Sequence, residues 1–158
     1  MAQKPPDALD RAILGALLED GRLSQVDLAD RVPLSPTAIA RRIRALEDAG
    51  LIEGYRAIIN QKALGLGMTV IVQISLKSQN EDLLDAFETA VAKAPSIVSC
   101  YLMSGDDDYL LTVLARDLAD FERIHKEQLS RLPGVARLKS SFALREVAGK
   151  GLRDLVRG

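Results

Sequence analysis

The spacing of apolar residues changes near residue 60, and this change limits the folds open to the chain. Before that point, apolar residues recur at intervals of three and four, as on the buried side of an α-helix. After it, segments that alternate apolar and polar residues are interleaved with segments of helical spacing. A chain of 158 residues is long enough for two small domains. The sequence therefore predicts an α+β protein, with a helical domain over residues 1–60 and a mixed domain over residues 61–158.

Three short helices are predicted within the first 60 residues. Each begins after a residue type that favours helix N-caps, namely Asp7, Ser24 and Ser35. Asp27 completes a capping box with Ser24, and Pro36 occupies a first helical position, where the missing N–H has no cost. A short helix, a tight turn and a third capped helix are the units of a helix-turn-helix. Residues 52–59 are strand-like in composition, so a winged form of this motif is expected.

The second half has the element order of a ferredoxin-like domain. Period-two alternation predicts strands, and apolar residues at helical spacing predict two helices between them. The expected strands cover residues 69–76, 97–103, 109–115 and 135–147, and the helices cover residues 83–94 and 118–132. The order β-α-β-β-α-β predicts an antiparallel sheet with both helices packed on one face.

The other face of this sheet would carry apolar side chains with no helix above them. Ile71 lies on that side of the first strand, and residues 110–114 are apolar on both sides. An exposed apolar patch on a globular protein usually marks a partner surface. The sequence therefore predicts that this face packs on a second copy, giving a homodimer or a larger oligomer.

The third helix has a face suited to double-stranded DNA. Ile39, Ile43 and Leu46 fall on one side of a helical projection, and small residues and arginines fall on the other. Small side chains permit close approach to a major groove, and arginine can bind guanine edges or phosphates. The chain as a whole has a net charge of −1, so any basic surface must be local. A solvated helix face with three arginines is the alternative. The candidate DNA-contacting residues are Ser35, Thr37, Ala38, Arg41, Arg42 and Arg44.

Several segments together resemble the Lrp/AsnC family of transcription regulators. The matching segments are residues 9–14, 34–37, 42–47, 50–55, 104–111 and 132–135. The resemblance implies an N-terminal helix-turn-helix that binds DNA and a C-terminal module that dimerises and often assembles into octamers, as tetramers of dimers. It also implies an amino-acid effector, leucine or another apolar amino acid among the candidates, bound between subunits and altering assembly or DNA affinity. Pro33 stands where the family often has glycine, so the turn geometry could differ there.

The acidic loop at residues 105–108 admits three interpretations. A metal site needs convergent oxygens, which adjacent residues on an extended chain do not supply, so no metal is expected. A β-turn whose aspartates bond to the backbone is a second interpretation. The family resemblance gives a third, in which a loop carboxylate receives the ammonium group of an amino acid. The effector-binding candidates on this basis are Tyr101, Met103, Ser104, Gly105, Asp106, Asp108, Ser140 and Ser141.

Other features exclude several function classes. One cysteine and one histidine, Cys100 and His125, leave no ligand set for a structural zinc. No phosphate loop, dinucleotide fingerprint or nucleophile elbow is present, so neither an enzyme nor a cofactor beyond the amino acid is expected. No signal peptide or membrane span is found, which predicts a cytoplasmic protein. The expected function is a sequence-specific, amino-acid-responsive transcription regulator. The alternatives are an amino-acid-sensing module that docks a partner protein, and a metal enzyme using residues 106–108.

Overall fold

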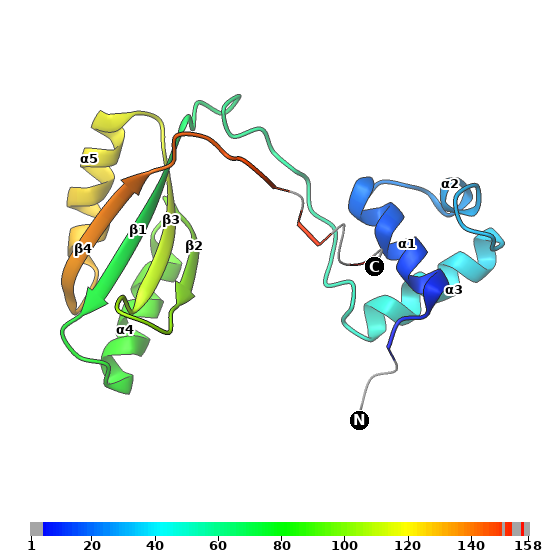
Figure 1. Ribbon diagram of the computed structural model, residues 1–158, viewed down its shortest axis with the longest axis horizontal. Helices are drawn as coiled ribbons and strands as arrows, with labels where there is room; N and C mark the ends of the chain where they lie inside the picture. The colour runs from blue at the N-terminus through cyan, green and yellow to red at the C-terminus, as the bar shows by residue number, and fades with distance from the viewer. Residues whose placement is uncertain (1–4, 150, 153–155, 157–158) are drawn as a thin grey trace. The chain divides into compact units, whose positions relative to one another are not determined.

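The chain divides into two compact units in the computed structural model, which describes residues 5–149, 151–152 and 156 (Figure 1). The first unit ends at residue 58 and also includes the described residues from Val147 onward, and the second covers residues 59–146. The sequence places the boundary at residue 60 and assigns the whole C-terminal end to the second domain. The contacts instead group the described residues from Val147 onward with the helical unit.

The helical unit contains the three predicted helices. They are α1 (Ala8–Glu19), α2 (Gln25–Ala29) and α3 (Pro36–Asp48). Asp7, Ser24 and Ser35 cap them as predicted, and the capping box of Ser24 with Asp27 is confirmed. The buried residues of this unit form one apolar core: Ile13, Ala16, Leu28, Val32, Ile39 and Leu46. This core fixes one side of α3 and leaves the other side exposed.

The second unit is a four-stranded antiparallel sheet with two helices, as predicted. Its elements are β1 (Met68–Leu76), α4 (Glu81–Lys93), β2 (Ile97–Leu102), β3 (Tyr109–Ala115), α5 (Leu118–Glu127), a 3₁₀ turn η1 (Leu129–Arg131) and β4 (Val135–Phe142). The strand order is β2-β3-β1-β4, and every neighbouring pair is antiparallel. This is the ferredoxin-like order, with β1 and β3 at the centre.

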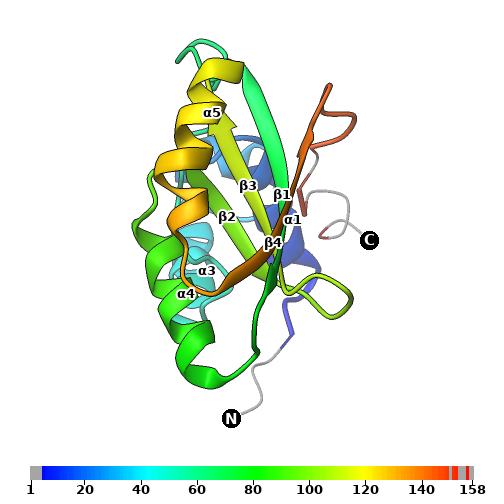
Figure 2. The ribbon, with the colours of Figure 1, turned by 90° about the vertical axis from the view of Figure 1, so that its left-hand side faces the viewer.

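Both helices cover one face of the sheet (Figure 2). Alternate residues of the central strands are buried beneath them, including Val72 of β1 and Leu111 of β3, together with Phe87 of α4 and Phe121 of α5. The residues between them point to the other face because successive side chains of a strand alternate. We call this other side the open face. It carries Ile71, Gln73 and Ser75 of β1, Leu110, Thr112 and Leu114 of β3, Ser99 and Tyr101 of β2, and Arg137, Lys139 and Ser141 of β4.

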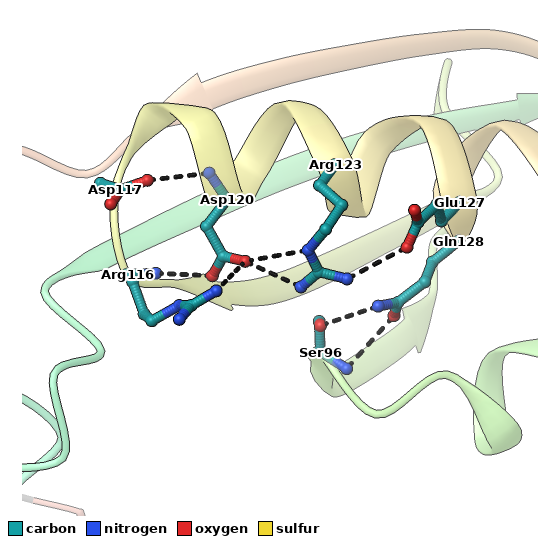
Figure 3. A network of polar contacts seen from close by, with 7 residues as sticks. All are labelled: Ser96, Arg116, Asp117, Asp120, Arg123, Glu127 and Gln128. Atoms are coloured by element: carbon teal, nitrogen blue, oxygen red, sulfur yellow. Dashed lines mark hydrogen bonds and ion pairs between the residues drawn. The ribbon is translucent and has the colours of Figure 1, made fainter.

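The start of α5 is fixed by a charged network (Figure 3). Asp120 accepts hydrogen bonds from the backbone N–H of Arg116 at 3.0 Å and from its guanidinium at 3.1 Å. Arg123 donates to the same carboxylate at 2.7 Å and to Glu127 at 3.1 Å. The Asp120 side chain is only 7% exposed, so its charge is balanced by two arginines at the point where β3 turns into α5.

One predicted strand is absent, and another ends earlier than predicted. Residues 52–59 form no strand in the described structure, and none of their N–H groups from residue 53 onward forms a backbone hydrogen bond there. A strand-like composition is not enough for a strand, because a strand also needs a neighbour for its ladder. For the same reason β4 ends at Phe142 rather than at residue 147. The helix predicted over residues 118–132 is divided in two, because α5 ends at Glu127 and η1 follows it.

None of the described helices combines the length and apolar character needed to cross a membrane.

Candidate nucleic-acid interface and acidic loop

Helix α3 exposes the side that the sequence assigned to DNA. The hydroxyl of Ser35 accepts a hydrogen bond from the backbone N–H of Ala38 at 3.3 Å, and Pro36 follows at the first helical position. Ile39 and Leu46 are buried against the rest of the helical unit. Among the candidates, Thr37, Arg41 and Arg44 are exposed and Ala38 is half-buried. These four residues lie on the accessible side of α3, and a fifth candidate, Ser35, is exposed at the start of the helix.

A groove runs along this surface between α3 and the turn that joins α1 to α2. We call it the basic groove, because three arginines and one glutamate line it. Its lining residues include Arg22, Ser24 and Gln25 from the turn and α2, Arg41, Arg44 and Glu47 from α3, and Tyr55 from the following segment. Neither Arg22 nor Tyr55 was predicted from the sequence to belong to this surface. Arg22 lies outside the third helix, on which the DNA prediction was based, and only the packing of α1 and α2 on α3 brings it to the groove.

Tyr55 attaches the segment after α3 to the helical unit. Its hydroxyl donates a hydrogen bond to Oε1 of Glu47 at 3.1 Å. Partial burial, followed by the Glu47 hydrogen bond and charge, raises the pKa of Tyr55. The phenol therefore stays protonated at neutral pH and acts as a donor.

Arg42 lies apart from the other arginines of α3. Its Nη1 donates to Oδ2 of Asp7 at 2.8 Å and to Oδ1 of Asp10 at 2.7 Å. These hydrogen bonds raise the pKa of Arg42, with Asp7 as the largest cause, and the Asp10 backbone N–H followed by Arg42 lowers the pKa of Asp7. The guanidinium thus connects α3 to the N-terminus of α1.

The acidic loop between β2 and β3 uses two of its three aspartates to bind the rest of the sheet. Asp107 accepts hydrogen bonds from three side chains: Gln73 at 2.7 Å, Ser75 at 3.1 Å and Arg137 at 3.0 Å. Desolvation alone would raise the pKa of the Asp107 carboxyl, but the hydrogen bonds from Arg137 and Ser75 and then the charges of Arg137 and Lys139 outweigh it and lower the pKa. These contacts hold the loop over the open face.

Asp108 is bound on the other side of the loop. Its carboxylate accepts from the backbone N–H of Leu76 at 2.6 Å and from Gln79 at 2.5 Å, and the residue is only 9% exposed. Asp106 is exposed, and its carboxylate forms no hydrogen bond with the residues that the structure describes. Gly105 beside it has a φ of 156°, a conformation that residues with a Cβ rarely adopt. The three carboxylates therefore do not converge.

The remaining effector candidates are divided between two faces. Tyr101 is 59% exposed on the open face, and Met103 and Ser104 are exposed at the start of the loop. Ser141 pairs with Ile71 and shares the open face, whereas Ser140 pairs with Val72 on the helix-covered face. The Ser140 hydroxyl is buried and has no hydrogen-bond partner among the described residues. The two serines therefore cannot line one pocket on a single face of this sheet.

Comparisons with known proteins match both units. A winged helix-turn-helix DNA-binding family matches residues 6–53, and the Lrp/AsnC ligand binding domain matches residues 69–151. Among curated proteins, the chain is 45% identical to the Bkd operon transcriptional regulator of Pseudomonas aeruginosa, over 89% of this chain and 92% of that one. It is 42% identical to the leucine-responsive regulatory protein of Escherichia coli, over 91% of this chain and 88% of that one.

A solved structure shares the fold over nearly the whole chain. A transcriptional regulator from Neisseria meningitidis, crystallised as a complex with L-Met, superposes with a TM-score of 0.88 at 34% identity and covers 94% of this chain and 98% of its own. A helix-turn-helix with an exposed basic groove, joined to a ferredoxin-like ligand-binding domain, defines a transcription regulator that binds DNA and an amino acid. The chain belongs to the Lrp/AsnC family. A module that docks only a partner protein is therefore not favoured.

Proposed function

We propose that the basic groove is the surface that this regulator places on DNA. Thr37, Ala38, Arg41 and Arg44 of α3 face the bases of a major groove, and Arg22 at the turn before α2 contacts phosphate. The observation that carries this proposal is the gathering of three arginines from two elements around one groove on a chain whose net charge is −1. Because its partner is chromosomal DNA, the protein acts in the cytoplasm.

The test is binding to a duplex that the wild-type protein selects from a random-sequence pool. Arg41→Gln and Arg44→Gln each weaken binding by a factor that corresponds to about 1 to 3 kcal/mol, the usual worth of a good base contact. Lys126→Gln, on the exposed side of α5, removes the same charge and leaves the affinity unchanged. Equal affinity of all three variants would contradict the proposed groove.

The ligand of the second unit is an amino acid, and we propose that the acidic loop receives its ammonium group. Asp106 is the one aspartate of this loop that is exposed and has no hydrogen bond from its carboxylate to the described residues, and Gly105 beside it has no side chain to block a ligand. Tyr101, Met103 and Ser104 lie next to it, and Asp107 and Asp108 hold the loop in shape. The L-Met complex of the Neisseria meningitidis relative supports an apolar amino acid.

A thermal-shift screen against the standard amino acids tests this assignment. A ligand at a hundred times its Kd stabilises the folded state by about 2.7 kcal/mol, so the effector is the amino acid that raises the melting temperature. Asp106→Asn abolishes the shift, and Asp85→Asn on the outer side of α4 preserves it. A full shift with Asp106→Asn would place the ammonium group elsewhere.

We also propose that the open face joins two copies of the chain. Ile71, Leu110, Leu114 and Tyr101 lie on it, and both helices of the second unit lie on the opposite face of the sheet. Association that removes this apolar area from water stabilises the dimer. The homodimer built in this way assembles further into an octamer, as a tetramer of dimers.

A further inference from the structure

The ion cluster of Asp7, Asp10 and Arg42 joins the first helix to the third. Asp7 and Asp10 form a reciprocal capping box, in which each carboxylate accepts the backbone N–H of the other residue, at 2.9 and 3.1 Å. The second oxygen of each carboxylate accepts from the same Nη1 of Arg42. All four oxygens are therefore used, and the guanidinium is held at one defined place on the N-terminus of α1.

Arg42 faces away from the groove that the other arginines line. Successive residues of a helix are rotated by about 100°, so Arg42 lies about 100° from Arg41 and about 160° from Arg44. Its side chain is 26% exposed, and that of Asp10 is 18% exposed. The basic groove is lined by Arg41 and Arg44 and not by Arg42.

We propose that Arg42 is a positioning residue for DNA recognition: it fixes the orientation of α3 through the capping box of α1 and makes no contact with phosphate. This inference rests on the proposed DNA-binding function of the groove. The apolar core of the unit attracts α1 to α3 without specifying direction, whereas charge-assisted hydrogen bonds to two fixed carboxylates are directional. A small rotation of α3 about its axis would move Arg41 and Arg44 relative to the base edges.

Salt dependence separates this role from a phosphate contact. Each phosphate contact contributes about 0.9 to the slope of log Kd against log salt concentration. Arg42→Gln weakens binding to the selected duplex roughly tenfold, equivalent to about 1.4 kcal/mol, and leaves that slope unchanged. Its affinity for a scrambled duplex of the same length stays within about twofold of wild type, because non-specific binding depends on phosphate contacts. A shallower slope, with equal losses on both duplexes, would overturn the proposal.

The aspartates of the cluster provide a second test, in which a phosphate role and a positioning role for Arg42 predict opposite changes in DNA affinity. Asp10→Asn removes a negative charge, so a phosphate role for Arg42 predicts tighter DNA binding once the arginine is released. The positioning role predicts weaker binding to the selected duplex, and the Arg42→Gln/Asp10→Asn double variant should be little weaker than either single variant. Asp48→Asn, at the exposed end of α3, removes the same charge without touching the cluster. Tighter binding of Asp10→Asn would overturn the proposal.

All affinities are measured well below the melting temperature of each variant, so that a loss of stability alone does not change Kd. Arg42→Lys, which keeps one charge for the two carboxylates, restores part of the selectivity between the selected and the scrambled duplex. If Arg42→Gln does not fold, Asp10→Asn and Arg42→Lys decide the question. If the wild-type protein selects no duplex, the proposed DNA-binding function itself is contradicted. If Arg41→Gln weakens binding but the variants of Arg42 and Asp10 keep normal selectivity, only the positioning role of Arg42 is contradicted.

Discussion

At the scale of single residues, buried charge is the feature with the clearest consequence for stability. Hydrogen bonds from Arg116, first from its side chain and then from its backbone, and from Arg123 hold the pKa of Asp120 far below its ordinary value of 3.8. A carboxylate with a lowered folded-state pKa stabilises the folded state above its unfolded-state pKa, and this contribution is lost as the pH falls through the folded-state pKa. Asp120 therefore stabilises α5 at neutral pH, and this support begins to fade below about pH 4.

Asp120→Asn is expected to lower the melting temperature at pH 7 by a few degrees. The difference from wild type should shrink as the pH falls from 4 toward 2, because the Asp120 carboxylate of the unfolded wild-type chain then takes up a proton that folding must release. Thermal unfolding followed by circular dichroism at a series of pH values measures this difference. Asp117→Asn, which keeps an N-cap acceptor for α5, serves as the control. A difference that is independent of pH would show that the charge of Asp120 is not its source.

Gly134 carries a second residue-scale prediction. Its φ is +72°, and a Cβ added there would lie 2.5 Å from Cδ1 of Leu83. Gly134→Ala therefore costs both backbone strain and a clash, about 2 to 3 kcal/mol of the free energy of unfolding. Gly65 has a similar φ of +78° with nothing within 4 Å, so Gly65→Ala costs only the backbone part, about 1 to 2 kcal/mol. Chemical denaturation measures both, and equal losses would contradict the role of the Leu83 contact.

At the scale of elements, local signals predicted more than long-range ones. The N-caps at Asp7, Ser24 and Ser35 were predictable because a cap joins residues only three apart. The order of the strands and helices followed from apolar spacing for the same reason, since each period is read within one segment. The strand expected at residues 52–59 failed because a strand also needs a neighbour, and the sequence does not show whether one is present.

The candidate site was predicted unevenly on the same grounds. Helical phase alone placed Arg41 and Arg44 on the exposed side of α3. The partners of Arg42 lie 32 and 35 residues away, so an arginine on the flank of a helix gave no sign of them. The difference between Asp106 and Asp108 likewise depends on residues of β1 and the segment after it, which only the folded sheet brings to the loop.

The segment after α3 carries an element-scale prediction. The hydroxyl of Tyr55 is bound to Glu47, and its ring lies near Gly21, so the tyrosine holds residues 51–58 against the helical unit. Arg56 is already exposed, but cleavage after it needs a mobile backbone, so Tyr55→Ala should release this segment and make it a better protease substrate. Trypsin cleavage after Arg56, followed by mass spectrometry under native conditions, should be severalfold faster than in wild type. Ile58→Ala is the control, because that side chain is already 99% exposed, and equal acceleration by both would contradict an anchoring role for Tyr55.

At the scale of the whole molecule, the open face decides how many copies assemble. Leu110 lies at its centre, paired with Gln73 on one side and Tyr101 on the other. A lysine there would have to be buried without a partner when two such faces meet, which costs several kcal/mol, whereas a single chain leaves it in water. Light scattering should therefore give at least twice the 17.2 kDa chain mass for the wild type and the chain mass itself for Leu110→Lys.

The matched control for this prediction is Ala86→Lys, which adds the same charge on the exposed side of α4 and should keep the wild-type mass. Assembly also bears on DNA recognition, because one helix-turn-helix binds weakly and two that are held together bind paired half-sites. Leu110→Lys should accordingly weaken binding to the selected duplex although it lies far along the chain from the basic groove. A wild-type protein of single-chain mass would refute the interface, and a monomeric Leu110→Lys with full affinity would show that one helical unit is sufficient for binding.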